Sequence, residues 1–232
     1  MSVSVIVLAA GKGTRMNSEL PKVLHKVLGK YLLSHTLDAL SISDNKIVVV
    51  GHEADLVIDS LPPSIKNILQ KDQLGTGHAV STVINSEVFK KSKSDFTLVV
   101  PGDVPGINDG DIELLINKVK TTSSPVGFLT ALVEDPFGYG RVVKINEEIK
   151  IVEEKDCSED EKAINEINSG IYCFKTEFLI ENIDSLNTEN AQGEFYLTDL
   201  IGIANNQKQD IVIVQVDEDS IKGINSMSQL NE

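Results

Sequence analysis

The sequence VSVIVLAAGKGTRM at residues 3–16 joins an apolar run to a loop of small residues and cations. The run 3–8 has almost no polar alternation, which is typical of a strand buried on both faces of a parallel sheet. The loop follows the carboxyl end of that strand, where open α/β sheets bind ligands. Its small side chains let a ligand approach the backbone, whose N–H groups can cradle phosphate. The segment therefore predicts a phosphate or nucleotide site at this edge of a sheet.

Three cations, Lys12, Arg15 and Lys22, lie in or just after this loop. They could meet phosphates while a base lies on the small residues. The spacing matches neither the P-loop pattern GxxxxGK[ST] nor the dinucleotide pattern GxGxxG. It therefore favours a nucleotide site unlike those of ATPases and NAD enzymes. For Lys12, phosphate contact and solvent exposure are equally good interpretations.

Strand-like and helix-like segments alternate along the chain, which predicts an α/β protein built from βαβ units. The expected sheet is Rossmann-like, mixed and mostly parallel, with flanking helices. The pattern predicts strands at 3–10, 47–50, 65–69, 96–100, 126–133, 141–145, 149–153, 167–174 and 211–216. It predicts helices at 32–40, 54–61, 76–85, 109–119 and 197–204.

The composition limits the classes of function. The chain has 232 residues and a formal net charge of −14. This acidic balance argues against nucleic-acid binding, which needs a basic surface. Cys157 and Cys173 lack metal-ligand spacing, so we expect reduced thiols in a cytoplasmic protein. The apolar run 3–10 has no basic lead and is too short to cross a bilayer, so we expect neither a signal peptide nor a membrane partner.

Residues 8–16 followed by Pro21-Lys22 resemble the signature of sugar nucleotidyltransferases. Further blocks resemble one subfamily in order and spacing: the uridyltransferase domain of the bacterial bifunctional N-acetylglucosamine-1-phosphate uridyltransferase/glucosamine-1-phosphate acetyltransferases. The resemblance extends over nearly the whole chain. The further blocks are Gln73–Ala79, Gly138–Arg141, Glu166–Gly170, Asn190–Asp199 and Gly223–Asn225.

The resemblance implies uridylyl transfer from UTP to N-acetylglucosamine 1-phosphate, with UDP-N-acetylglucosamine and pyrophosphate as products. The attacking phosphate oxygen is already an anion, so the protein must supply positioning and charge neutralisation rather than a general base. The implied fold is that of nucleotide-diphospho-sugar transferases, as a single domain. We expect a nucleotide-binding part to about residue 135, a smaller sugar-binding lobe over about 136–225, and the start of a carboxyl-terminal arm at 226–232.

The residues expected to act on phosphate are Arg15, Lys22 and Asp103. Arg15 offers a planar fork for the β- and γ-phosphates and the departing pyrophosphate. Lys22 offers a point charge for the α-phosphate and the attacking sugar phosphate. Asp103 follows a strand and has hard oxygens suited to Mg²⁺, and the resemblance implies Asn225 as the second metal ligand. Taken alone, Asp103 would more often be a helix or turn cap and Asn225 a turn residue.

The resemblance also implies two sets of binding residues. The amides of Gln70 and Gln73 can both donate and accept, as the imide edge of uracil requires. The expected nucleotide set is Leu8, Ala9, Ala10, Gly11, Lys22, Gln70, Gln73, Gly75, Thr76, Gly102 and Asp103. The expected sugar set is Gly140, Glu153, Asn168, Tyr196, Thr198 and Asn225. Core or helix-cap roles are equally plausible for Tyr196 and Thr198, and His78 favours a packing role over that of a base.

Two departures from the family pattern stand out. Pro101 occupies a position that is usually aromatic, which can alter packing beside the nucleotide. The chain ends at Glu232 without hexapeptide periodicity, so we expect no acetyltransferase domain, and the oligomeric state is left open. Two alternative functions also stay open. One is a nucleotidyltransferase for glucose 1-phosphate or with dTTP as donor, and the other is a catalytically idle nucleotide-binding domain.

Overall fold

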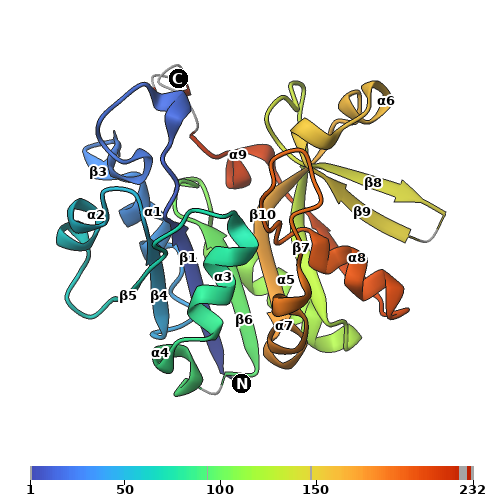
Figure 1. Ribbon diagram of the computed structural model, residues 1–232, viewed down its shortest axis with the longest axis horizontal. Helices are drawn as coiled ribbons and strands as arrows, with labels where there is room; N and C mark the ends of the chain where they lie inside the picture. The colour runs from blue at the N-terminus through green and yellow to red at the C-terminus, as the bar shows by residue number, and fades with distance from the viewer. Residues whose placement is uncertain (1, 93, 147, 225–228, 231–232) are drawn as a thin grey trace.

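The computed structural model describes residues 2–92, 94–146, 148–224 and 229–230 (Figure 1). A nine-stranded sheet forms its centre, with β11-β7-β10-β6-β1-β4-β5 as the main order. Strand β8 pairs with β10, and β9 pairs with β8. The strands are β1 (Val3–Ala9), β4 (Lys46–Val50), β5 (Lys66–Leu69), β6 (Phe96–Pro101), β7 (Val126–Leu132), β8 (Arg141–Ile145), β9 (Glu148–Val152), β10 (Glu166–Lys175) and β11 (Ile211–Gln215).

The sheet is mixed, as the sequence predicts. Strand β1 runs parallel to both β4 and β6, β4 parallel to β5, and β7 parallel to β11. Strand β10 is antiparallel to β6 on one side and to β7 on the other. It therefore separates the two parallel groups, although its sequence lies after both β6 and β7.

Helices cover both faces of the sheet (Figure 1). Side chains of α1, α2, α5 and α9 belong to one apolar core, and side chains of α3, α4, α7 and α8 belong to the other. The continuous apolar runs of β1 and β6 supply residues to both cores, which explains their lack of polar alternation. The helices are α1 (Leu32–Asp38), α2 (Ala54–Ser60), α3 (Thr76–Ile84), α4 (Glu87–Lys90), α5 (Asp109–Thr122), α6 (Glu159–Lys162), α7 (Thr176–Asn182), α8 (Asp199–Asn206) and α9 (Glu218–Ile221).

Local signals explain where the best-formed helix begins and ends. The Asn108 side chain accepts a hydrogen bond from the Asp111 N–H (3.0 Å) and so caps the start of α5. The helix ends at Thr122, and the next residue, Ser123, has a left-handed φ of +59°. Ile112, Leu115 and Val119 face the core between these two ends, as the helical spacing predicts.

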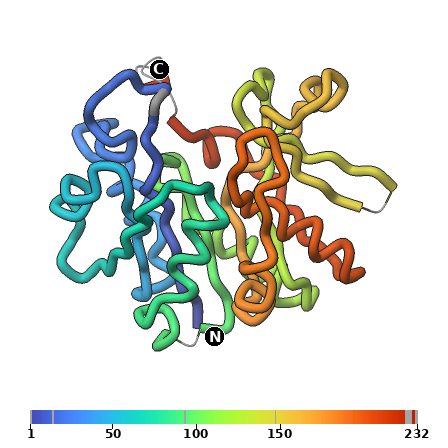
Figure 2. The backbone as a smooth tube through the Cα atoms, in the orientation of Figure 1, coloured from blue at the N-terminus to red at the C-terminus, as the bar shows by residue number. Residues whose placement is uncertain are grey.

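The antiparallel pair β8–β9 projects from the sheet as the expected hairpin (Figure 2). Helix α8 packs beside it, and the Asn205 side-chain amide donates to the Ile149 carbonyl oxygen (2.5 Å). In the part of the chain that the structure describes, no helix has both the length and the apolar character needed to cross a bilayer.

Each expected strand and helix has a counterpart within a few residues of its predicted bounds. The short elements β2 (Lys26–Val27), β3 (Lys30–Tyr31), α4, α6, α7 and α9 were not predicted. All of these except α7 are only two to four residues long, which is too few turns or alternations for a period to be visible in sequence. The resulting fold is the mixed, mostly parallel α/β arrangement expected.

Candidate active site

A cavity of about 880 Å³ opens at the carboxyl ends of β1 and β6, the edge that the sequence predicts. The glycine loop after β1 forms one wall, and the segment 70–76 before α3 forms another. The segment 138–140 and the irregular stretch of β10 around Asn168 close the side that faces the β8–β9 hairpin.

Most of the predicted site residues line this one cavity. Two predicted residues that the structure describes, Gly102 and Tyr196, do not line it, and Asn225 lies outside the described residues. Those that line it are Leu8, Ala9, Ala10, Gly11, Arg15, Lys22, Gln70, Gln73, Gly75, Thr76, Asp103, Gly140, Glu153, Asn168 and Thr198.

Gly102 and Tyr196 support the cavity from outside. The Gly102 N–H donates to the Leu8 carbonyl oxygen (2.9 Å), so this glycine ties the end of β6 to the end of β1. The Tyr196 hydroxyl donates to Asp156 Oδ2 (3.0 Å) and accepts from Gln192 Nε2 (2.9 Å). These bonds hold the Tyr196 hydroxyl in a network of its own, and burial raises its pKa.

The cationic side of the cavity is built on the close approach of two loops. Gly13 has a φ of +58°, and a Cβ atom added there would lie 2.6 Å from Lys22 Cβ. Only glycine lets the loop after β1 pack this tightly against the Pro21-Lys22 segment. The Lys22 ammonium forms an ion pair with the Asp103 carboxylate, and the two side chains are only 18% and 13% exposed. Arg15 lines the same cavity.

Asp103 fits a magnesium ligand by its chemistry and place. It lies just beyond β6, is 9% exposed and presents a carboxylate in the cavity. Mg²⁺ commonly takes one or two carboxylates and completes its shell with phosphates and water. Within the described residues no group of three or more acidic, His or Cys side chains could hold a metal ion. A single carboxylate of this kind has the chemistry of a ligand to a metal that takes its other ligands from phosphates and water.

The opposite wall is fixed by its glutamines. Gln70 is 3% exposed, and its amide nitrogen donates to the Gly75 carbonyl oxygen (3.1 Å) and lies 3.0 Å from His78 Nδ1. The Gln73 amide nitrogen donates to the carbonyl oxygens of Gln70 (2.9 Å) and Lys71 (3.1 Å). Both side chains thus stabilise the conformation of this loop, a role additional to the expected recognition of uracil. His78 has the packing role that its sequence favours, with its ring 6.3 Å from that of Phe195.

Gly75 explains why two distant blocks of the sequence meet at this wall. Its φ is +104°, and an added Cβ atom would lie 2.6 Å from the Phe195 carbonyl oxygen. That same oxygen accepts a hydrogen bond from the Gly77 N–H (2.8 Å). The start of α3 therefore packs directly on the segment 190–199, which also brings Thr198 to the cavity.

The third wall carries Glu153 and Asn168. The Glu153 carboxylate accepts from the Thr198 hydroxyl (3.3 Å), and burial raises its pKa. The Asn168 amide nitrogen donates to the Tyr172 hydroxyl (2.6 Å), while its side-chain oxygen accepts from the Gly170 N–H (3.2 Å). The Asn168 N–H donates to the Gly140 carbonyl oxygen (2.8 Å). One amide orientation of Asn168 is thereby fixed.

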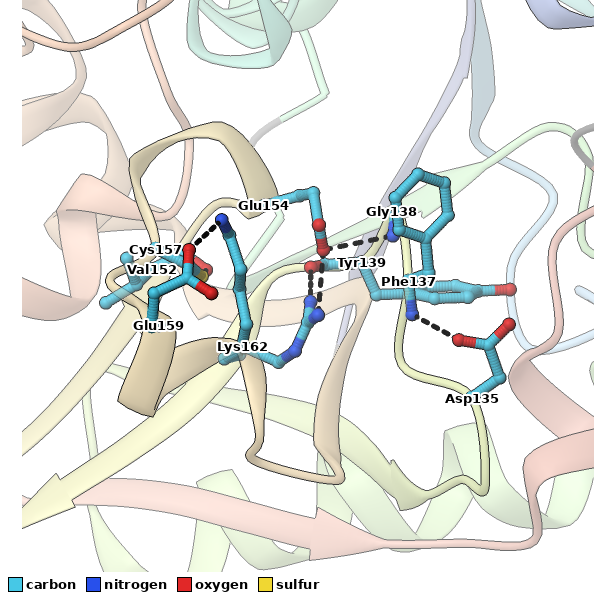
Figure 3. Close-up of polar contacts among 10 residues, drawn as sticks. Asp135, Phe137, Gly138, Tyr139, Val152, Glu154, Cys157, Glu159 and Lys162 are labelled. Carbon is cyan, nitrogen blue, oxygen red and sulfur yellow. Dashed lines mark hydrogen bonds and ion pairs between the residues drawn. The ribbon is translucent and has the colours of Figure 1, made fainter.

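Of two adjacent glutamates, Glu153 lines the cavity and Glu154 does not. The structure ends β9 at Val152 and starts a 3₁₀ turn at Glu154. The turn lets Glu153 line the cavity, while the Glu154 carboxylate reaches the Gly138 N–H (Figure 3).

Two tyrosines of the cavity were missed. Tyr139 lines it, and burial and the nearby Asp103 carboxylate raise the pKa of its hydroxyl while Arg15 and the Gly223 backbone lower it. Tyr172 also lines it. Tyr139 lies inside a block quoted for Gly140, and Tyr172 lies four residues after Asn168. Residues four apart on a strand lie on the same face, so the spacing of Asn168 and Tyr172 could have indicated that Tyr172 lies beside the expected sugar site.

Comparison with known proteins gives a consistent result. Residues 5–147 match the model of the MobA-like NTP transferase domain. The chain is 45% identical over 231 residues to the bifunctional protein GlmU of Clostridium beijerinckii, covering 98% of this chain and 50% of that protein. It is 43% identical over 228 residues to the bifunctional protein GlmU of Fervidobacterium nodosum, covering 98% of this chain and 49% of that protein. The chain thus spans about half the length of the curated relatives it matches.

The fold also matches a solved structure. The crystal structure of a putative glucose-1-phosphate thymidylyltransferase from Bacillus anthracis in complex with sucrose aligns with a TM-score of 0.76. The alignment covers 99% of this chain and 93% of that chain at 19% sequence identity. At this identity the match establishes a shared fold.

Proposed function

Because this chain belongs to the MobA-like NTP transferase domain family, we propose that it transfers uridylyl from UTP to N-acetyl-α-D-glucosamine 1-phosphate, giving UDP-N-acetylglucosamine and pyrophosphate. One observation supports this most strongly. A single cavity is lined by the glycine loop with Arg15 and Lys22 and also by Glu153 and Asn168. A nucleoside triphosphate and a sugar phosphate can therefore occupy adjoining parts of one space.

The proposed chemistry needs no general base. An oxygen of the sugar phosphate forms a bond to the α-phosphorus of UTP as the bond to the pyrophosphate oxygen breaks. Arg15 binds the β- and γ-phosphates and the departing pyrophosphate, because its fork matches phosphate oxygens. Lys22 binds the α-phosphate and holds the attacking phosphate near it. The protein thus orients two anions and offsets their charge.

Asp103 and Asn225 are the residues that would hold Mg²⁺. When bound, the ion supplies positive charge to the phosphates of UTP. The ion pair between the Asp103 carboxylate and the Lys22 ammonium supports this proposal, because it shows that the two groups lie side by side in the cavity.

The remaining walls suit uracil and an acetamido sugar. The backbone of Leu8 to Gly11 and the loop of Gln70, Gln73, Gly75 and Thr76 form the proposed uridine site. In the sugar site, Glu153 accepts from hydroxyl groups, and Asn168 offers an amide whose direction is fixed by Tyr172. Gly140 leaves room for the acetamido group.

We propose one domain over residues 1–232, with its nucleotide-binding part to about residue 135. The pairing of β10 with both β6 and β7 supports this, because it joins the later part of the chain to the earlier sheet. We also propose a cytoplasmic location, since Cys157 and Cys173 are both free, buried thiols.

Release of pyrophosphate tests the function directly. The chain is incubated with Mg²⁺ and UTP or dTTP, and with N-acetylglucosamine 1-phosphate or glucose 1-phosphate. We expect the highest rate with UTP and the acetamido sugar, and loss of activity in EDTA. A preference for dTTP or glucose 1-phosphate would favour the alternative transferase, whereas nucleotide binding without turnover would favour the idle domain.

We expect the affinity for the sugar phosphate to fall on mild acidification. Burial raises the pKa of Glu153, so this carboxylate takes up a proton at a higher pH than an exposed glutamate. Protonation removes a charged acceptor, whose hydrogen bonds contribute about 1.5–3 kcal/mol, so KM is expected to rise about 10-fold or more. Initial rates between pH 8 and pH 5 measure this. Glu153→Gln should have a high KM with a flatter pH dependence, and parallel profiles for the two proteins would contradict the assignment.

The raised pKa of Glu153 also predicts that acidification, which weakens substrate binding, increases the contribution of Glu153 to folding stability. A folded-state pKa above the unfolded value means that the folded protein binds the proton more tightly. The stabilisation from Glu153 is therefore complete below the unfolded pKa and is lost as pH rises through the folded pKa. At pH 8, Glu153→Gln is expected to unfold at a higher temperature than the parent while binding sugar phosphate more weakly.

Tyr172→Phe is expected to raise KM for the sugar phosphate about 10-fold and to leave UTP binding unchanged. The variant removes the acceptor of the Asn168 amide, and an unsatisfied buried group costs about 1–3 kcal/mol. Initial rates and UTP titrations measure the two effects. Tyr196→Phe is the matched control, because that hydroxyl bonds outside the cavity lining. Equal KM values for both variants would show that Tyr172 does not orient Asn168.

A further inference from the structure

Arg141 is a buried arginine that the proposed chemistry does not use. It is 1% exposed and begins β8. Its Nη2 atom lies 2.8 Å from Glu154 Oε2, and its Nη1 atom donates to the carbonyl oxygen of Tyr139. A guanidinium removed from water is tolerated only with compensating partners. Glu154 and the Tyr139 carbonyl are such partners for the two Nη atoms, and the pair of Arg141 and Glu154 is here called the clamp.

The clamp holds the backbone of the cavity wall at 138–140. Glu154 Oε2 accepts from the Gly138 N–H (3.1 Å; Figure 3). The same oxygen accepts from Arg141. The Tyr139 carbonyl oxygen accepts from the other guanidinium nitrogen. Adjacent residues of the wall are thus fixed through one N–H and one carbonyl, by side chains that belong to β8 and to the turn after β9.

The wall at 138–140 touches both halves of the cavity. Gly138 has a φ of +84°, and an added Cβ atom would lie 2.8 Å from Arg15 Nη1. The wall backbone therefore rests against the guanidinium proposed to bind pyrophosphate. At the other end, the Gly140 carbonyl oxygen accepts from the Asn168 N–H (2.8 Å), and an added Cβ atom would lie 3.5 Å from Glu153 Oε2.

From this geometry we infer that the Arg141–Glu154 clamp positions the phosphate half of the cavity relative to the sugar half. The inference rests on the proposed function, and it assigns Arg141 and Glu154 as positioning residues because neither lines the cavity. Arg15 is held at one end of the wall and the sugar residues at the other, so the clamp sets the approach of one phosphate to the other. A misplacement of about 1 Å can lower a rate about 100-fold.

Both charges and the shape of the arginine are needed for this role. A lysine at 141 keeps the positive charge but cannot present two fixed donors to Glu154 and the Tyr139 carbonyl together. A glutamine at 154 keeps an acceptor for the Gly138 N–H but loses the ion pair. Glu159 and Lys162 form another ion pair nearby (2.8 Å), with side chains 90% and 43% exposed (Figure 3). Glu159→Gln is therefore a matched control for the loss of one carboxylate outside the clamp.

The test combines kinetics with hydrogen exchange on the intact chain. Arg141→Lys, Glu154→Gln, the double variant and Glu159→Gln are compared with the parent for pyrophosphate release, thermal unfolding and exchange in peptides covering 136–142. We expect each clamp variant to lower kcat/KM for the sugar phosphate about 10- to 100-fold and to speed exchange at 136–142. The double variant should lose less than the product of the two single losses, because both act on one network. Glu159→Gln should match the parent.

Three results would overturn the inference. One is a kcat/KM equal to that of the parent in both clamp variants. Another is a lowered unfolding temperature with unchanged kcat/KM, which would assign the pair to stability alone. The third is unchanged exchange at 136–142. An inactive parent would refute the proposed function instead, and the exchange result would then still decide whether the clamp orders the wall.

Discussion

Asp103→Asn is expected to lower kcat by about 1,000-fold or more while leaving the protein folded. The substitution keeps the size of the side chain but removes the charge that pairs with Lys22 and that would bind Mg²⁺. A metal ion at a transferring phosphoryl group contributes several kcal/mol to transition-state stabilisation, and 1.36 kcal/mol corresponds to a factor of ten. Removing the carboxylate also breaks the ion pair with the Lys22 ammonium.

Pyrophosphate release at saturating substrates measures this effect, and calorimetric titration of Mg²⁺ with UTP gives a second readout. Asp95→Asn is the matched control, because Asp95 precedes β6 just as Asp103 follows it. The control should keep parental activity, since Asp95 bonds to Ser2 at the opposite end of the strand. Parental turnover by Asp103→Asn would remove Asp103 from the metal site.

Arg15→Ala is expected to lower kcat about 100- to 1,000-fold, the usual cost of losing one donor aimed at transition-state charge. The charge on the leaving pyrophosphate grows as the bond to the α-phosphorus breaks, so the loss should appear in kcat more than in KM for UTP. Arg15→Lys should be intermediate, because lysine keeps the charge and loses the fork.

Steady-state rates for both Arg15 variants provide the check, with unfolding temperatures to confirm that each is folded. A rise in KM at constant kcat would make Arg15 a ground-state ligand of UTP. An unchanged kcat and KM would exclude it from phosphate binding altogether. The pair of variants therefore separates the need for charge from the need for geometry.

Much of the fold could be predicted from local patterns. The apolar run of β1 and the capped, amphipathic α5 carry their signals within one element, and both appear where expected. The place of β10 could not be predicted in this way. Its neighbours are β6 and β7, and the paired residues lie between 34 (Glu166 and Leu132) and 79 (Lys175 and Phe96) positions apart in the chain. Pairing over such distances leaves no trace in the hydrophobic period of either strand.

The site residues likewise include some that local sequence identifies and others whose role depends on contacts with distant segments. Arg15, Lys22 and Asp103 follow strand ends, where residue type and position already indicate ligand binding, and all three line the cavity. Glu154 and Tyr172 gain their roles from contacts with other segments: Glu154 with Gly138, and Tyr172 with the cavity wall. Tyr196 was expected in the sugar site because it lies within a block that resembles the family. Its hydroxyl instead bonds to Asp156, outside the cavity lining.

The position of β10 has a consequence for how the chain matures on the ribosome. When residues up to 135 have been made, β6 and β7 both exist, but the strand that must stand between them has not been synthesised. A nascent chain of that length has two unfinished strand edges, which are prone to pairing with other chains. The two proposed ligand sites should thus become able to bind at the same time, late in translation, rather than one after the other.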